Sequence, residues 1–175
     1  ISLRLVGSEM CIRDSVNFVD NNFDVCHEML SDPNSIMGLG DGGAHVGFIL
    51  DAGYPTWLLS YWTRDKKLFS LEDSIRRLTS DTASAIGLYD RGAIKEGLKA
   101  DINILDIKNL GSSDPYMLKD LPAGGSRLMQ KTSGYLANIV SGKITYVKGK
   151  KENVLPGKLV KLINIQEKFK EKDLV

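Results

Sequence analysis

The sequence predicts an α/β protein whose C-terminal half is rich in β-strands. Before Gly87, apolar residues recur at near-helical spacing in several stretches. Beyond Gly87, short apolar runs that partly alternate are separated by turn residues, which is the pattern of strands. With 175 residues and 42% hydrophobic content, the chain is long enough to bury a core.

The first predicted unit is a helix, a tight turn and a strand. The spacing of apolar residues predicts a helix over 22–31, which Asp32-Pro33-Asn34 should end. The short apolar run over 35–39 predicts a buried strand, because it leads into the glycine-rich turn at 40–43. A helix, a turn and a strand in this order are typical of an α/β fold.

Three further helices are predicted before the chain changes character. The first covers residues 56–64, and the second begins after Ser70, which is a good N-cap with acidic residues in the following turn. A third, short helix over 81–86 should stop at Gly87. The buried face of the second helix is predicted to carry Leu71, Ile75 and Leu78.

The C-terminal half is predicted to be a small β-rich unit that the chain enters near Gly92. Residues 101–106 read as one strand, and residues 136–146 read as two strands around a two-residue turn at Ser141-Gly142. Residues 108–134 are predicted to be a long loop. The Lys- and Glu-rich tail from Lys158 is typical of a solvated helix or a frayed end.

Charge and cysteine content exclude several classes of partner. Lys and Arg number 23 against 22 Asp and Glu, so no net field attracts nucleic acid or an anionic membrane. No apolar run approaches the roughly 20 residues that a bilayer span needs. Two cysteines, Cys11 and Cys26, cannot build a disulfide framework. We therefore expect a cytoplasmic protein that binds neither nucleic acid nor membrane.

The run Gly38-Leu39-Gly40-Asp41-Gly42-Gly43-Ala44-His45 is the densest cluster of reactive groups and permissive backbone. Asp41 should follow the C-terminal end of a strand, where α/β folds place ligands and catalytic groups. A carboxylate there can bind a metal or move a proton. A plain Asp-Gly turn is the alternative. A phosphate cradle is disfavoured, because the phosphate-loop signatures are missing and Asp41 would repel phosphate.

The chain holds two histidines, His27 and His45. A hydrolytic metal centre needs about three protein ligands. Such a centre would therefore need carboxylates or residues outside this chain.

Residues 1–15, ISLRLVGSEMCIRDS, resemble translated sequencing-library adapter, and we exclude them from the fold reasoning. The alternative is a native, frayed N-terminal arm. In the adapter interpretation the genuine chain begins near Val16, and residues 1–15 should be poorly packed.

Three stretches carry a family resemblance: SIMGLGDGGAHVGFILDAGYPTWLLSYW, LEDSIRRLTSDTASAIGLYDRGAIKEGLKADINILD, and DLPAGGSRLMQKTSGYLANIVSGKITYVKGK. Together they resemble the C-terminal third of the amidohydrolase superfamily, specifically its N-acyl-D-amino-acid deacylase (D-aminoacylase-like) group. The run from Gly92 to Asp106 is similar to a passage common to many amidohydrolases. The Gly-x-Gly-Asp-Gly-Gly-Ala-His run, with Asp51 to Thr56, points to the narrower group.

The resemblance implies a C-terminal fragment of a (β/α)8 TIM-type barrel, with its last strand and helices, plus part of a small β-sandwich. Residues 16–91 would end the barrel, 92–160 would belong to the β-sandwich, and 161–175 would be a polar tail. The histidines that such a family places on earlier strands have no counterparts here. The fragment alone is therefore expected to be inactive.

By this resemblance, the protein is a zinc-dependent hydrolase of non-peptide carbon–nitrogen bonds, with an N-acyl amino acid or a related amide as its substrate. Asp41 matches the aspartate of strand eight, which faces the metal and acts as general base and then general acid. His45, Gly42 and Gly43 are the candidate substrate contacts, with positioning of Asp41 and loop packing as the alternatives for His45. The alternatives are a cyclic-amide hydrolase of the dihydroorotase or hydantoinase sort and a non-catalytic β-rich interaction module.

Other reactive side chains have structural interpretations. His27 is expected on a helix surface or interface, and Cys26 in the core. Arg127 is predicted to be structural, with recognition of a substrate carboxylate as the alternative. The aromatic residues at near-helical spacing are interpreted as core, with a wall for an acyl chain as the alternative; they are Tyr54, Trp57, Tyr61 and Trp62.

Overall fold

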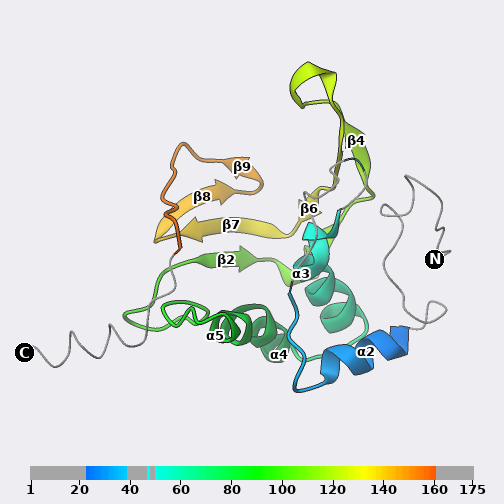
Figure 1. Ribbon diagram of the computed structural model, residues 1–175, viewed down its shortest axis with the longest axis vertical. Coiled ribbons are helices and arrows are strands. Elements are labelled where there is room, and N and C mark those ends of the chain that lie inside the picture. Colours follow the sequence, from blue (N-terminus) through cyan, green and yellow to red (C-terminus); the bar gives the residue numbers. More distant parts are fainter. Residues whose placement is uncertain (1–22, 39–46, 48–49, 161–175) are drawn as a thin grey trace, which may run out of the picture. The chain divides into compact units, whose positions relative to one another are not determined.

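The computed structural model describes residues 23–38, 47 and 50–160 (Figure 1). The chain divides into two compact units, one made of Ile1–Ile75 with Asp106–Gly134, the other of Arg76–Leu105 with Tyr135–Val175. Helices and antiparallel sheets are both present, so the mixed α/β class is confirmed. In the described part of the chain, no helix is long and apolar enough to cross a membrane.

The first described element of the first unit is helix α2 (Phe23–Ser31), which confirms the helix predicted over 22–31. The predicted stop also holds, because the Asp32 carboxylate accepts a hydrogen bond from the Asn34 backbone N–H at 2.7 Å. The strand predicted over 35–39 is wrong for its described part. Residues 35–38 form no strand, and the Ile36 side chain is 53% exposed. No described neighbour supplies the backbone hydrogen bonds that a strand requires.

A continuous helical stretch follows and confirms the helix predicted over 56–64. It comprises η2 (Asp51–Gly53), α3 (Tyr54–Trp57) and the π-helical segment η3 (Leu58–Asp65). Pro55 lies in the first turn of α3, where its missing N–H costs no helical hydrogen bond. The core of this unit gathers on η3 and includes Leu58, Leu59 and Trp62.

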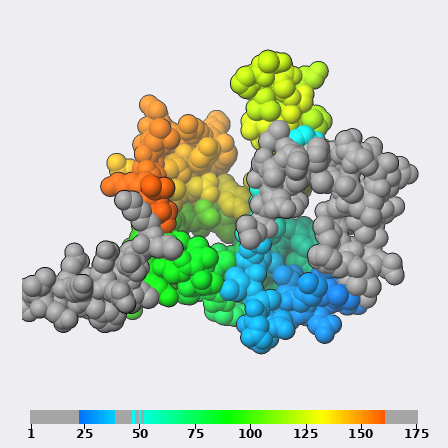
Figure 2. All heavy atoms as spheres, in the orientation of Figure 1, coloured from blue at the N-terminus to red at the C-terminus, as the bar shows by residue number. Residues whose placement is uncertain are grey.

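The predicted loop over 108–134 contains regular structure that the sequence pattern did not reveal. Antiparallel strands pair β3 with β6 and β4 with β5. Figure 2 shows the turn of the β4–β5 hairpin, in yellow-green, at the surface. In order, the elements of this segment are η5 (Ile107–Asn109), β3 (Gly111–Ser112), β4 (Tyr116–Leu118), η6 (Pro122–Gly124), β5 (Arg127–Met129) and β6 (Thr132–Ser133).

The next helical segments are α4 (Leu71–Arg76), η4 (Arg77–Asp81) and α5 (Thr82–Ala85). The N-cap prediction is confirmed, because Ser70 Oγ accepts a hydrogen bond from the Asp73 N–H at 3.1 Å. The predicted stop at Gly87 is confirmed by its φ of 75°. The predicted buried face is wrong at Leu71, which is exposed, whereas Ser74 is fully buried.

The second unit holds a four-stranded antiparallel sheet with the strand order β2-β7-β8-β9 (Figure 1). Its strands are β2 (Ile102–Leu105), β7 (Tyr135–Val140), β8 (Lys143–Val147) and β9 (Lys150–Lys151). This confirms the strand predicted over 101–106 and the hairpin predicted around Ser141-Gly142. Ser141 and Gly142 have φ values of 50° and 75°, as a type I′ turn requires. Lys148 and Gly149 repeat these positive φ values in the next hairpin.

Candidate functional site

The candidate site lies in the connection between α2 and α3. Its first residue, Gly38, is described and exposed. Asp41, Gly42, Gly43 and His45 lie outside the described residues, so their predicted roles stay predictions. The described structure shows what supports the two ends of this connection.

An aromatic cluster joins α2 to the helical stretch after the connection. The Phe23 ring lies 5.9 Å from Trp57, 5.7 Å from Tyr61 and 6.0 Å from Trp62, measured between ring centroids. Trp57 and Tyr61 stack with an interplanar angle of 6°. Such contacts contribute about 0.5–1.5 kcal/mol each beyond the burial of area. The cluster therefore holds the elements on both sides of the connection together.

Burial separates the two interpretations of these aromatic residues. Trp62 is 1% exposed, so this side chain is core. Its indole Nε1–H has no hydrogen-bond partner, the single such case among buried side-chain atoms in the described residues. Trp57 is 41% exposed and remains open to contact with an acyl chain.

His27 and Cys26 lie on helix α2. The His27 ring stacks on Trp62 at 5.9 Å and contacts Phe69 at 5.0 Å between centroids. Cys26 is half-buried and forms no disulfide. The ring contacts agree with the helix-surface or interface position expected for His27.

Arg64 connects the end of η3 to the segment around η5 through hydrogen bonds. Its guanidinium donates hydrogen bonds to three backbone carbonyls, those of Ile107, Lys108 and Leu110. Arg64 also donates to the Asp65 carboxylate at 2.7 Å, which lowers the pKa of Asp65. No sequence pattern indicates this role, because the backbone partners of Arg64 lie 43–46 residues away.

Two further contacts lie within the first unit. Gly53 approaches the segment beyond η5 so closely that an added Cβ would lie 2.9 Å from Gln130 Oε1. Arg127 Nε donates a hydrogen bond to Asp120 Oδ1 at 2.8 Å, and this contact lowers the pKa of Asp120. The ion pair supports the structural interpretation of Arg127.

The described residues do not supply a metal centre. Within 23–38, 47 and 50–160, no three His, Cys, Asp or Glu side chains lie together in a way that could hold an ion. A structural or catalytic zinc needs three or four protein ligands. The described residues therefore provide no support for the predicted zinc site.

Comparison with known proteins establishes the class. The chain belongs to the amidohydrolase family, whose model matches residues 16–146. This match supports a hydrolase, in a family whose members are typically metal-dependent.

One relative adds detail within this class. Over 98 residues the chain is 30% identical to a dihydroorotase from Lactobacillus acidophilus, a stretch that covers 54% of this chain and 22% of the relative. The chain thus spans about a fifth of the length of the curated relative it matches. No solved structure matches the chain.

Proposed function

We propose that this chain is part of a zinc-dependent amidohydrolase that cleaves the acyl amide of N-acyl-D-amino acids. The observation that carries the proposal is the family match over residues 16–146, which includes the whole glycine-rich run around Asp41. The Gly-x-Gly-Asp-Gly-Gly-Ala-His run supports the deacylase group within the family. The proposal covers a larger protein of which the matched residues 16–146 form a part.

In this proposal Asp41 is the group that moves protons. An amide is a poor electrophile with a poor leaving group, so water must lose a proton before it attacks and the departing amine must gain one. One carboxylate at the active-site face serves both steps. Gly42 and Gly43 leave the backbone open to substrate, and His45 contacts the substrate or positions Asp41.

Zinc, when bound, would supply Lewis acidity that lowers the pKa of water. Asp41 is the metal-facing carboxylate that this chain contributes. We place the remaining ligands on segments of the larger protein. From the family resemblance, we expect these ligands to be a His-x-His, a Cys or other bridging residue, and two later histidines.

The test begins with the source DNA upstream of Val16. The longer protein is expressed and assayed for metal content and for hydrolysis of N-acetyl-D-amino acids, with N-acetyl-L-amino acids as the stereochemical control. We expect bound zinc and selective hydrolysis of the D substrate. Asp41→Asn should lower kcat by about 10²–10⁴-fold, the usual contribution of a general acid–base.

Asp32→Asn is the matched control, because Asp32 lies before the connection and bonds the backbone of Asn34. This variant should keep its kcat. The proposal is contradicted if the upstream reading frame lacks these metal ligands, or if Asp41→Asn keeps full activity. Hydrolysis of dihydroorotate or hydantoin in place of the acyl amides would move the protein to the cyclic-amide class.

A further inference from the structure

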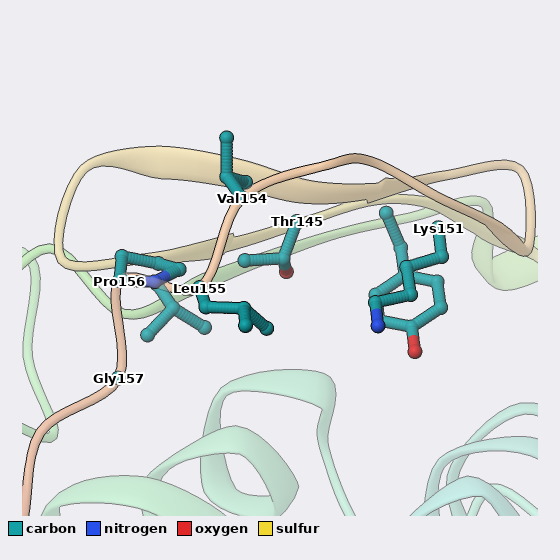
Figure 3. A pocket seen from close by; sticks show the side chains of 8 residues that line it. Thr145, Lys151, Val154, Leu155, Pro156 and Gly157 are labelled. Atoms are coloured by element: carbon teal, nitrogen blue, oxygen red, sulfur yellow. The ribbon is translucent and has the colours of Figure 1, made fainter.

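A pocket in the second unit lies outside the candidate site. It opens between the four-stranded sheet and the strap, our name for residues 152–157 that follow β9 (Figure 3). Its volume is about 470 Å³, and it is widely open to solvent, since the Leu155 side chain is 86% exposed. Its lining comprises Val140, Thr145, Tyr146, Lys151, Val154, Leu155, Pro156 and Gly157.

The two ends of the pocket differ in chemistry. Figure 3 shows Lys151 at one end and the apolar side chains of Leu155 and Pro156 toward the other. Tyr146 is the register partner of Lys151 across β8 and β9, so the two side chains project from the same face of the sheet. One end therefore offers an ammonium and a phenol as hydrogen-bond donors, while the other end is apolar.

These donors are available to a ligand. Within the described residues, neither the Lys151 ammonium nor the Tyr146 hydroxyl makes a side-chain hydrogen bond or an ion pair. By contrast, the pocket hydroxyl of Thr145 is already engaged, since it donates to the Asn138 carbonyl at 3.1 Å. The polar end thus has two donors and no described acceptor that uses them.

The local charge favours an anion. Residues 143–158 contain five lysines and one acidic residue, Glu152. Such an excess of one sign concentrates ligands of the opposite sign. However, a single lysine lines the pocket. Lys150 is paired with Val147, and as the neighbour of Lys151 in the strand it projects from the opposite face. One cation matches a monoanion better than a doubly charged phosphate.

We propose that this pocket binds an aliphatic monocarboxylate, such as a medium-chain fatty acid. Its carboxylate accepts hydrogen bonds from Lys151 and Tyr146, and its chain lies against Leu155 and Pro156. The strap is held next to the sheet by a hydrogen bond from the Glu152 N–H to the Thr145 carbonyl at 2.8 Å. None of these residues takes part in the proposed hydrolysis, so the two proposals stand or fall separately.

The experiment titrates the 175-residue chain with decanoate below its micelle concentration, followed by calorimetry and by backbone amide NMR shifts. We expect saturable binding with shifts at the pocket residues. Lys151→Gln should weaken binding roughly tenfold, the loss expected for one charge-assisted hydrogen bond. Lys150→Gln is the matched control and should bind as the parent chain does.

A second variant tests the apolar end. Leu155 lines the apolar end and its side chain is 86% exposed, so Leu155→Ser should leave the fold intact. We expect this variant to fold normally and to bind decanoate more weakly.

Three results would overturn the proposal. The first is equal binding of decanol, which lacks the carboxylate, and the second is unchanged binding in Lys151→Gln. The third is binding of decanoate that appears only when the residues after Val160 are removed. That result would mean that the chain's own C-terminal segment occupies the pocket.

Discussion

The pair of buried hydroxyls at Thr63 and Ser74 offers a sharp test of the described packing. Thr63 Oγ1 donates to the Leu58 carbonyl at 3.0 Å and lies 2.6 Å from Ser74 Oγ. Because the single hydroxyl proton of Thr63 is already used, Ser74 must be the donor in the second contact. Ser74 is 0% exposed and Thr63 is 8% exposed, so water replaces neither partner.

The cost of each substitution follows from which group it leaves unpaired. Ser74→Ala removes a donor and leaves Thr63 with its own bond, so we expect a loss of about 1 kcal/mol. Thr63→Val leaves the buried Ser74 hydroxyl without a hydrogen-bond acceptor and should lower the free energy of unfolding by about 2 kcal/mol. In the double variant no serine hydroxyl remains unpaired, so its loss of stability should be smaller than that of Thr63→Val.

Urea unfolding followed by tryptophan fluorescence measures the four free energies of this double-mutant cycle. A double variant whose loss equals the sum of the two single losses would refute the reasoning. Ser84→Ala is the control, because Ser84 is exposed and should change stability by less than about 0.5 kcal/mol.

Three other expectations address the backbone and the charges. Gly134→Ala should lower the free energy of unfolding by about 3 kcal/mol or more, because φ is 82° and the new Cβ would lie 2.6 Å from Leu110 Cα. Gly97→Ala is the control, because Gly97 has the same φ but open space around it, and it should lower this free energy by only about 1–2 kcal/mol. Thermal unfolding measures both values. Ser141→Asn should raise stability by about 0.5 kcal/mol in urea titration, since Asn-Gly suits a type I′ turn. Hydrogen bonding from Arg91 lowers the pKa of Asp90, so this pair stabilises the fold above the ordinary aspartate pKa of about 4 and loses its effect as pH falls through the lower folded pKa. Arg91→Met should therefore flatten the decline of the urea midpoint between pH 6 and 2.5, and an unchanged decline would contradict this assignment.

The elements predicted correctly are those whose signals are local. The Ser141-Gly142 turn supplies two positive φ angles between two apolar runs, and this is sufficient to define a hairpin. The Ser70 cap and the Asp32 stop likewise depend on hydrogen bonds within three residues. Such features can be read from a short window of sequence.

The features that were missed depend on distant partners. Strands of two or three residues, such as β3 and β4, are too short to show a period. What holds this segment is the approach of Gly134 to Leu110 and the hydrogen bonds of Arg64 to backbone carbonyls. Backbone acceptors carry no residue identity, so no pattern in the sequence marks them.

The candidate site shows the same division between local and distant information. The pattern around Asp41 predicts a strand end followed by a permissive turn, but an Asp-Gly turn alone does not distinguish catalysis from chain reversal. The assignment of a proton-moving role comes from the family resemblance, and the family match covers those residues. Substrate and metal depend on groups that must converge on Asp41 from other elements.

Residues 35–38 show why a correct pattern can still give a wrong element. Their apolar run has the length and flanking signals of a buried strand, yet the described chain pairs none of its backbone groups in a sheet, and Ile36 faces solvent. A strand is stabilised by hydrogen bonds and side-chain pairs contributed by its neighbours, so its own sequence shows only that it could form a strand. Ile104 on β2 and Ile144 on β8 are exposed apolar side chains that are likewise suited to burial. In both places the sequence encodes a surface suited to burial, and whether it is buried depends on what packs against it.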